Sequence, residues 1–405
     1  MSHNVNWKRN TALFLGGQAI TIIGSSMVSY AIMWYMTLET RSGSVLMVYT
    51  VAATLPTFFM APFGGVWADR HDRRNLINIA DGCIALVSLA IALAFTAGMD
   101  NIWLLLVCLA ARSLGQGVQS PAVGALIPQL VPEGHLMRAN GIYQSIMSVS
   151  LIGSPALGGV LLTFAPIQTV LFVDVVTAAI GISILAFLVK VPKREICESK
   201  KHEKPAYFHE MREGLRYIGE RRYMKRLFAF FTAYVILIAP AAMLTPLQVT
   251  RDFGADVWRL TAVEIGFSAG MAAGGVLISV WTGFKDKMNT IILGAVIIGV
   301  MTVGLGLLTN FWLYLACMVA IGISVPIVST PFTTILQTKS DDEYMGRVIG
   351  VLTMLSSVAM PLAMVVFGPL GDIVAIDWLL IATGAAIVIL CPIIAADRKV
   401  RDEIR

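Results

Sequence analysis

Gly64-Gly65-Val66-Trp67-Ala68-Asp69-Arg70-His71-Asp72-Arg73-Arg74-Asn75 separates two long apolar runs, one ending near Trp67 and the other starting near Leu76. Five of the six positions from Asp69 to Arg74 are charged. A connection this short cannot leave a membrane surface, so its charges are expected to lie at the boundary between lipid and water. The simplest interpretation is a solvated turn that orients two membrane helices.

The composition excludes a water-soluble globule. The chain has 405 residues, of which 57% are hydrophobic and 14% are charged, and its mean hydropathy is +0.77. Soluble domains are usually about one quarter charged. The net charge of +5 does not indicate nucleic-acid binding, because the cations gather between apolar runs. We therefore expect a membrane protein that binds no nucleic acid.

Counting apolar runs predicts twelve membrane spans, since a spanning helix needs about 20 mostly apolar residues. The runs are 11–36, 43–67, 75–97, 102–123, 140–163, 167–190, 226–248, 260–282, 289–309, 312–335, 347–371 and 376–396. The predicted fold class is an all-α membrane protein of two pseudo-symmetric bundles of six helices.

The distribution of Lys and Arg predicts the orientation. If the N-terminal tail is cytoplasmic, 26 of the 30 Lys and Arg lie in the tails, the central loop and every second connection. Only Arg41, Arg251 and Arg259 lie on the opposite side, and Arg112 lies within a span. This asymmetry predicts a multi-pass protein of the cell membrane with both termini in the cytoplasm.

Cysteine spacing gives no sign of a metal site or a disulfide framework. The chain has five Cys, none in a CxxC pattern, with four in apolar runs and Cys197 in a basic loop. We expect no metal and no cofactor. The first apolar run is about 25 residues long, which is too long for a signal peptide.

Residues 191–225 form the longest polar segment and divide the chain into an N-terminal bundle (1–190) and a C-terminal bundle (226–405). Within it Phe208, Met211, Leu215 and Ile218 recur at helical spacing, with arginines between them. This pattern predicts an amphipathic helix in the cytoplasmic interface. It is interpreted as a tether between the halves, with a docking site for a partner as the alternative.

The two halves repeat weakly at an offset near half the chain length. Ser120-Pro121 matches Thr330-Pro331, Arg138-x-x-Gly141 matches Arg347-x-x-Gly350, and Asp69-Arg70 has a possible echo in Asp286-Lys287. Together these matches predict a duplicated unit of six helices. Two such units are a transporter architecture with the substrate path at their interface.

The chain resembles the major facilitator superfamily over essentially its whole length. Within that superfamily it is most similar to the macrolide-efflux-like drug:proton antiporters. Gly65-x-x-Ala68-Asp69-Arg70-x-Asp72-Arg73-Arg74 matches the superfamily's loop motif between helices two and three. The segments Gly17-Gln18-Ala19-Ile20, Trp34-Tyr35 and Arg212-Glu213-Gly214-Leu215-Arg216-Tyr217 are similar to the efflux branch.

The resemblance implies that the loop is a cytoplasmic latch between the halves. Gly65 is expected to let two helices approach closely. Asp69 is expected to meet a cation or the positive end of a neighbouring helix, and Arg70 and Arg73 to complete the charge network.

Charged side chains within spans are the candidates for proton coupling. Arg112 matches the superfamily's fourth-helix Arg motif, whose role is to tune a nearby acid; the alternative is an Arg that reaches the membrane surface. Asp81 and Asp174 are the candidate acids, because buried carboxylates can load and release protons. Either acid could instead be an interfacial cap or a structural ion pair, and Glu264 is expected at the interface.

Helix five carries Gly153-Ser154-Pro155-Ala156-Leu157-Gly158-Gly159, which resembles the antiporter motif with one inserted Ser. Gly153, Gly158 and Gly159 present a flat surface, and Pro155 bends the helix. The resemblance implies an exporter.

Three residues are candidates for contact with the substrate. Gln18, Trp34 and Tyr143 lie in spans, where they could meet a lipophilic ligand or pack against other helices.

The sequence thus predicts a secondary transporter that exports a lipophilic, drug- or macrolide-like molecule in exchange for protons, as a monomer surrounded by membrane lipids. Alternative cargoes are a siderophore, a lysophospholipid or a metabolite. A polytopic membrane enzyme is a remote alternative, because the five His lie in tails and loops.

Overall fold

The computed structural model describes the chain except residues 1–6, 192–206, 282, 342–343, 397–402 and 404–405. The described residues are helical or in short connections, without strands. The chain divides into two compact units. Unit 1 comprises Met1–Met36 and Val48–His202, and unit 2 comprises Thr37–Met47 and Glu203–Arg405. Cys197 and the rest of residues 192–206, in the predicted polar segment, lie outside the described residues.

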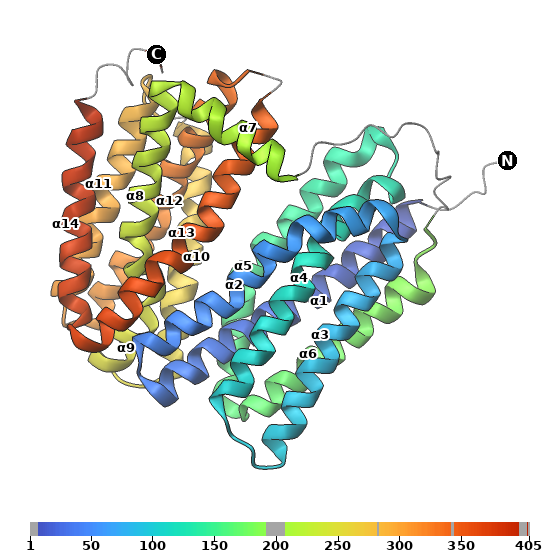
Figure 1. Ribbon diagram of the computed structural model, residues 1–405. Coiled ribbons are helices and arrows are strands. Elements are labelled where there is room, and N and C mark those ends of the chain that lie inside the picture. Colours follow the sequence, from blue (N-terminus) through green and yellow to red (C-terminus); the bar gives the residue numbers. More distant parts are fainter. Residues whose placement is uncertain (1–6, 192–206, 282, 342–343, 397–402, 404–405) are drawn as a thin grey trace. The chain divides into compact units, whose positions relative to one another are not determined.

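The first six spans are long helices (Figure 1). Their bounds are α1 Trp7–Thr40, α2 Gly43–Arg70, α3 Arg73–Thr96, α4 Ile102–Leu130, α5 Leu136–Phe164 and α6 Ile167–Ser183, with a 3₁₀ turn at Glu133–His135 and a π-helical turn, Ile184–Leu188, ending α6. In unit 1, α3 packs against α4 and α6.

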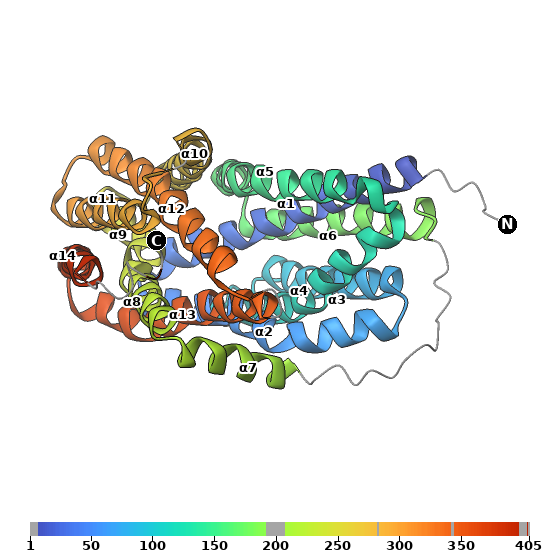
Figure 2. The same cartoon turned by 90° about the horizontal axis from the view of Figure 1, so that it is seen from above.

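The second half begins with a short helix and then gives six more spans. The bounds are α7 Tyr207–Glu220, α8 Arg222–Met243, α9 Thr245–Asp252, α10 Val257–Trp281, α11 Lys287–Leu307, α12 Phe311–Lys339, α13 Met345–Ile373 and α14 Ile376–Ala395. Here α12 packs against α10 and α11, and α11 against α14 (Figure 2). Twelve segments of the described chain are long and apolar enough to cross a membrane, as the sequence predicted.

The seventh span is interrupted, which the sequence did not predict. It consists of α8 and α9 in series, with Leu244 between them. Pro246 at the start of α9 has no backbone N–H, so it cannot continue the hydrogen bonding of α8. The hydroxyl of Thr245 instead donates to the carbonyl of Ala241 at 2.5 Å.

The residues that cap the helices align the two halves of the chain more clearly than the sequence matches do. Asn101 and Asn310 cap α4 and α12, and their side chains accept hydrogen bonds from the backbone N–H groups of Trp103 and Trp312. Asp286 caps α11 by accepting from Met288 N. Its counterpart is therefore Asp72, which caps α3, and the expected echo of Asp69 in Asp286 is wrong.

Helix α7 packs on α13 and α8 (Figure 1). The Glu213 carboxylate lies 3.1 Å from the Arg347 guanidinium, and the rings of Tyr217 and Tyr344 stack with centroids 4.5 Å apart. A Cβ on Gly214 would lie 2.9 Å from the Arg347 carbonyl oxygen. The buried face runs through Gly214, Tyr217 and Ile218, so it includes the predicted Ile218, whereas the predicted Leu215 is exposed.

The hairpin tip Thr37–Met47, which belongs to unit 2, is held by Asp372 of α13. The carboxylate of Asp372 accepts hydrogen bonds from Gly43 N at 2.6 Å and Ser44 N at 2.9 Å, and from the hydroxyls of Ser42 and Ser44. An anion at the first N–H groups of a helix is favourable, so Asp372 stabilises the start of α2.

Candidate functional site: a buried ion pair in unit 1

Arg112 of α4 and Asp174 of α6 form an ion pair in the interior of unit 1. Their side chains are 2% and 1% exposed. Arg112 Nη1 donates to Asp174 Oδ2, and Nη2 lies 3.5 Å from Oδ1. The alternative that Arg112 reaches the membrane surface is excluded by this burial. The structure thus joins two residues that the sequence proposed separately.

Two serines from neighbouring helices complete the cluster. Ser88 of α3 donates to Asp174 Oδ2 at 2.7 Å and accepts from Arg112 Nη1 at 2.8 Å. Ser25 of α1 donates to Asp174 Oδ1 at 3.3 Å, while its carbonyl accepts from Arg112 Nη2 at 3.2 Å. Four helices therefore meet at one pair of charges. Neither serine was predicted from the sequence as part of a site, although Ser88 lies on the buried face of α3.

The electrostatics of this cluster depend on mutual compensation. A charge within a span costs roughly 2.5–3.5 kcal/mol on insertion scales. Pairing offsets much of that cost only while both partners and their hydrogen bonds are present. Arg112 Nε has no hydrogen-bond partner among the described residues. Removing the charge of either partner would therefore leave the other charge buried and uncompensated.

Asp81 of α3 lies apart from this pair. It is 4% exposed, and its Oδ1 accepts a hydrogen bond from Gln119 Nε2 of α4 at 2.7 Å. The structure thus gives the two candidate acids different partners, an arginine for Asp174 and an amide for Asp81. Gln119 was not singled out from the sequence.

The loop between α2 and α3 is tied to α4 by Arg73. Its Nε donates to the carbonyl of Ala68 at 2.9 Å, and its Nη1 to the carbonyl of Ala125 at 2.7 Å. The Asp69 carboxylate lies 3.6 Å from Arg73 Nη2 and is 54% exposed. Arg70 is exposed as well. Within unit 1, Arg73 therefore anchors the loop, and Asp69 contacts it from the surface.

The close approach of helices expected at Gly65 occurs one residue earlier. A Cβ on Gly65 would meet no described atom within 4 Å, whereas a Cβ on Gly64 would clash with the Gly117 carbonyl oxygen. Helices α2 and α4 therefore touch through Gly64 and Gly117. Within unit 1, Gly65 faces away from this contact, because a one-residue shift rotates a side chain by about 100° around a helix.

The helix-five motif packs on α1. A Cβ on Gly158 would lie 3.0 Å from the Met27 carbonyl oxygen. Ser154 is fully buried and lies 3.4 Å from the Ile23 carbonyl oxygen and 2.9 Å from the Ser150 hydroxyl. The inserted Ser therefore takes part in the helix contact. Pro155 and Gly159 are also buried, while a Cβ on Gly153 would find open space among the described residues.

The candidate substrate contacts are mostly internal. Trp34 is fully buried and Gln18 is 4% exposed. Tyr143 is half-buried and packs against the apolar core of unit 1. None of these three residues lines the hollow between α1 and α5 or the hollow along the sixth span.

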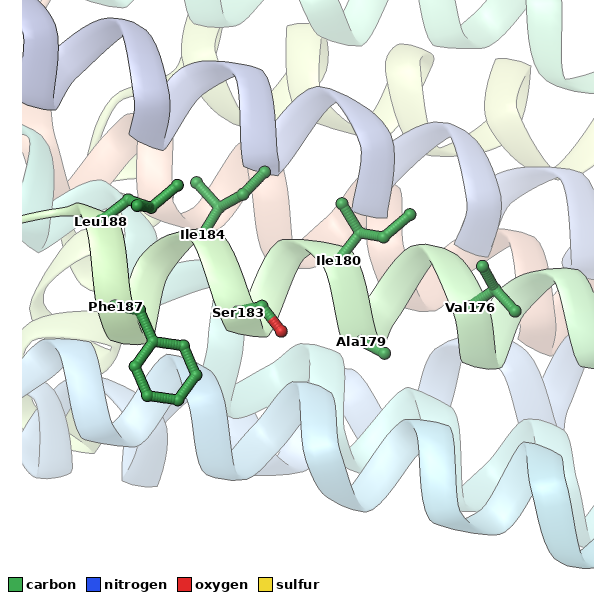
Figure 3. A pocket seen from close by; sticks show the side chains of 7 residues that line it. All are labelled: Val176, Ala179, Ile180, Ser183, Ile184, Phe187 and Leu188. Carbon is green, nitrogen blue, oxygen red and sulfur yellow. The ribbon is translucent and has the colours of Figure 1, made fainter.

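Two of the hollows in unit 1 lie along its spanning helices. One, of about 610 Å³, lies between α1 and α5 and has the basic residues Lys8 and Arg138 on its rim. The other, of about 550 Å³, is lined only by residues of the sixth span (Figure 3). Its wall is apolar apart from Ser183, and Phe187 is 83% exposed, which is typical of a lipid-facing surface.

In unit 2, the capping residues Asn101 and Asn310 align Ile321 of α12 with Arg112 and Gly322 with Ser113. A Cβ on Gly322 would clash with the Phe267 carbonyl oxygen of α10. The two helices therefore touch at this level through their backbones, whereas α2 and α4 meet there through Thr57 and Ser113, whose hydroxyl oxygens lie 2.7 Å apart.

Comparison with known proteins agrees with the fold and the motifs. The profile of the Major Facilitator Superfamily matches residues 14–364. Macrolide efflux protein A of Streptococcus pyogenes is 30% identical over 399 residues, which cover 97% of this chain and 98% of that protein. The multidrug efflux pump Tap of Mycobacterium bovis is 25% identical over 374 residues, covering 89% and 86% of the two chains.

A solved structure supports the same fold. It is a bacterial homologue of the human lysosomal transporter Spinster, with a TM-score of 0.72 and 14% sequence identity. The alignment covers 100% of this chain and 99% of that one.

Proposed function

The chain belongs to the Major Facilitator Superfamily and is a multi-pass membrane transporter rather than an enzyme, and from this premise we propose that it exports a lipophilic, macrolide-like compound in exchange for protons. The proposed location is the cell membrane, with both termini in the cytoplasm. Support for the cargo comes from the 30% identity to Macrolide efflux protein A.

The observation that carries the proton-exchange part is the buried cluster of Arg112 and Asp174. An ionisable residue sealed inside a span is expensive and is usually functional. Here the carboxylate of α6 is 1% exposed, and its partners come from three other helices. Protonation of Asp174 would weaken contacts that all four helices share. Asp174 is therefore the proposed proton carrier, and Arg112 the residue that compensates its charge.

Transport into everted membrane vesicles tests this function. Vesicles that contain the chain should accumulate radiolabelled erythromycin when a proton gradient is imposed, and a protonophore should abolish the accumulation. Accumulation that persists after the gradient collapses would contradict proton exchange. Failure with erythromycin, but success with a lysophospholipid, a siderophore or a metabolite, would change the cargo only.

Two matched variants test which acid carries the proton. Asp174→Asn should lower gradient-driven transport by about 100-fold or more, because the Arg112 charge would no longer be compensated in any step. Asp81→Asn should retain most of the transport, since an amide can still pair with Gln119. The assignment fails if Asp174→Asn transports normally across the pH range while Asp81→Asn does not transport.

A further inference from the structure

The hollow of about 610 Å³ in unit 1 runs from the starts of α1 and α5 into the span. From the basic residues Lys8 and Arg138 at its rim, its lining reaches Ala19 on α1 and Ile146 on α5. At 1.5 Å per residue these stretches are about 16 Å and 12 Å long. One leaflet is half of a hydrocarbon core of about 30 Å, so the depth of the hollow is comparable to one leaflet.

The lining of this hollow changes from charged and aromatic at the rim to apolar inside. At the rim, Trp7 stacks on His135 with ring centroids 4.7 Å apart, and Lys8 Nζ lies 5.8 Å from the centroid of the Trp7 ring. Tryptophan is enriched at the boundary between lipid and water, which places the rim at the level of the lipid headgroups. The wall further in includes Leu15, Gly16, Ala19, Ile142 and Ile146.

The apolar wall lies on the side of α5 that faces away from its polar residues. Asn140, Gln144 and Ser148 are exposed and recur every four residues, so they share one face. At about 100° per residue, this face lies about 120–160° around the helix from Ile142, which is 44% exposed and lines the hollow. Polar residues within spans face the interior of the bundle or a water-filled path. The hollow therefore opens towards lipid.

The polar groups of the hollow lack partners of their own. Lys8 and Arg138 are exposed, and neither has an ion-pair partner among the described side chains. Thr11 lies one turn after Lys8, is 8% exposed, and its hydroxyl has no hydrogen-bond partner among the described residues. A buried hydroxyl without a partner is unfavourable. Two cations and one hydroxyl thus await oxygen atoms at the mouth of an apolar hollow.

We propose that this hollow binds one anionic phospholipid, with its phosphate between Lys8 and Arg138 and an acyl chain along the apolar wall. Arginine can donate two parallel hydrogen bonds to a phosphate, and lysine adds a point charge. An ester oxygen below the phosphate would accept from Thr11. Basic pockets between spanning helices hold anionic headgroups in this way, whereas a zwitterionic headgroup carries its own cation. The site does not depend on the identity of the cargo.

Native mass spectrometry of the purified full-length chain in detergent tests the site. The probes are dioleoylphosphatidylglycerol, which is anionic, and dioleoylphosphatidylcholine, which has the same acyl chains and no net charge. The wild-type chain should bind the anionic lipid at least about tenfold more tightly. The double variant Lys8→Gln, Arg138→Gln should weaken its binding by about 25-fold, or fivefold per cation, and that of the zwitterionic lipid by less than about threefold. Gly16→Leu should weaken both, because a side chain added there enters open space in the hollow.

The matched control is Arg222→Gln, Lys225→Gln, which removes two exposed cations at the start of α8 and should leave the preference unchanged. Lys8→Arg, Arg138→Lys retains both charges and should retain the preference. Equal binding of the two lipids by the wild-type chain, or equal losses in the double variant and its control, would overturn the proposal. So would wild-type binding by Gly16→Leu. Glycerophosphoglycerol, the headgroup without acyl chains, should not displace the lipid, and full displacement would show a site for free phosphate esters instead.

Discussion

The two repeats bring their second and fourth helices together at different heights. In unit 1, these helices touch through Gly64 and Gly117. In unit 2, α10 and α12 touch through Gly270 and Gly322. The capping residues Asn101 and Asn310 align Gly322 with Ser113, so the glycine contact of unit 1 lies four residues further along the fourth helix.

At the level of Ser113, α2 and α4 meet instead through a hydroxyl group, because Thr57 Oγ1 donates to the Ser113 carbonyl at 2.7 Å. Arg112, one residue earlier, pairs with Asp174 of α6. Unit 2 has backbone contact at the same level, and its acid Glu264 has no described protein partner. We expect the pair in unit 1 to be sensitive to loss of either partner.

The largest expected effect comes from breaking the pair in unit 1. Arg112→Leu leaves the Asp174 carboxylate buried without its cation, which should lower the free energy of unfolding by about 3–5 kcal/mol and abolish transport. Unfolding by sodium dodecyl sulfate in mixed micelles measures the stability. The double variant Arg112→Leu, Asp174→Leu should recover most of the stability but no transport. A double variant no more stable than the single one would refute charge compensation.

The next effect comes from separating the touching helices of unit 2. Gly322→Ala places a Cβ against the Phe267 carbonyl oxygen, closer than van der Waals contact allows, so α10 and α12 must move apart. We expect a loss of about 1–3 kcal/mol, as for other overpacked interiors. The control is Gly275→Ala on α10, where a Cβ meets no described atom within 4 Å. Equal stability of the two variants would contradict the backbone contact.

A smaller effect is expected at Ser88. Ser88→Ala removes a donor to Asp174 and an acceptor for Arg112, which should cost about 1–2 kcal/mol while leaving the ion pair in place. Transport should fall several-fold and not vanish. Ser145→Ala is the control, because that exposed hydroxyl donates only to a carbonyl of its own helix. Vesicle transport and micelle unfolding of both variants measure the contribution of Ser88.

The smallest effect on stability is expected at the loop between α2 and α3. Asp69 is 54% exposed, and exposed ion pairs contribute about 0–1 kcal/mol, so Asp69→Asn should unfold almost like the wild-type chain. If the loop is the latch that its motif predicts, turnover should nevertheless fall strongly while the amount of protein in the membrane is unchanged. Full transport by Asp69→Asn would return the loop to a purely orienting role.

Much of the fold was predictable because lipid imposes a simple length rule. Twelve apolar runs became twelve spanning segments, and only their ends and the interruption at Leu244 differed. The site was predictable as a set of residue types. Arg112 and Asp174 were found because charges in spans are rare, whereas Ser25 and Ser88 were missed because serines occur throughout spans.

The differences concern rotation around helices. Within unit 1, Gly64 rather than Gly65 makes the close contact, and α7 buries Gly214, Tyr217 and Ile218 while exposing Leu215. The repeat was also aligned on the wrong aspartate, because Asp72 and not Asp69 caps a helix as Asp286 does. Local composition does not determine which side of a helix meets a neighbour.

By itself, the sequence determined the membrane class, the number of spans, the duplication and the residues that are costly to bury. These follow from hydropathy and charge, which act residue by residue. Only the tertiary structure decided that Asp174 takes Arg112, that Asp81 takes Gln119, and that Glu264 keeps its carboxylate without a described protein partner. Those pairings depend on the height and angle at which helices cross, and backbone contacts such as Gly64 with Gly117 set both.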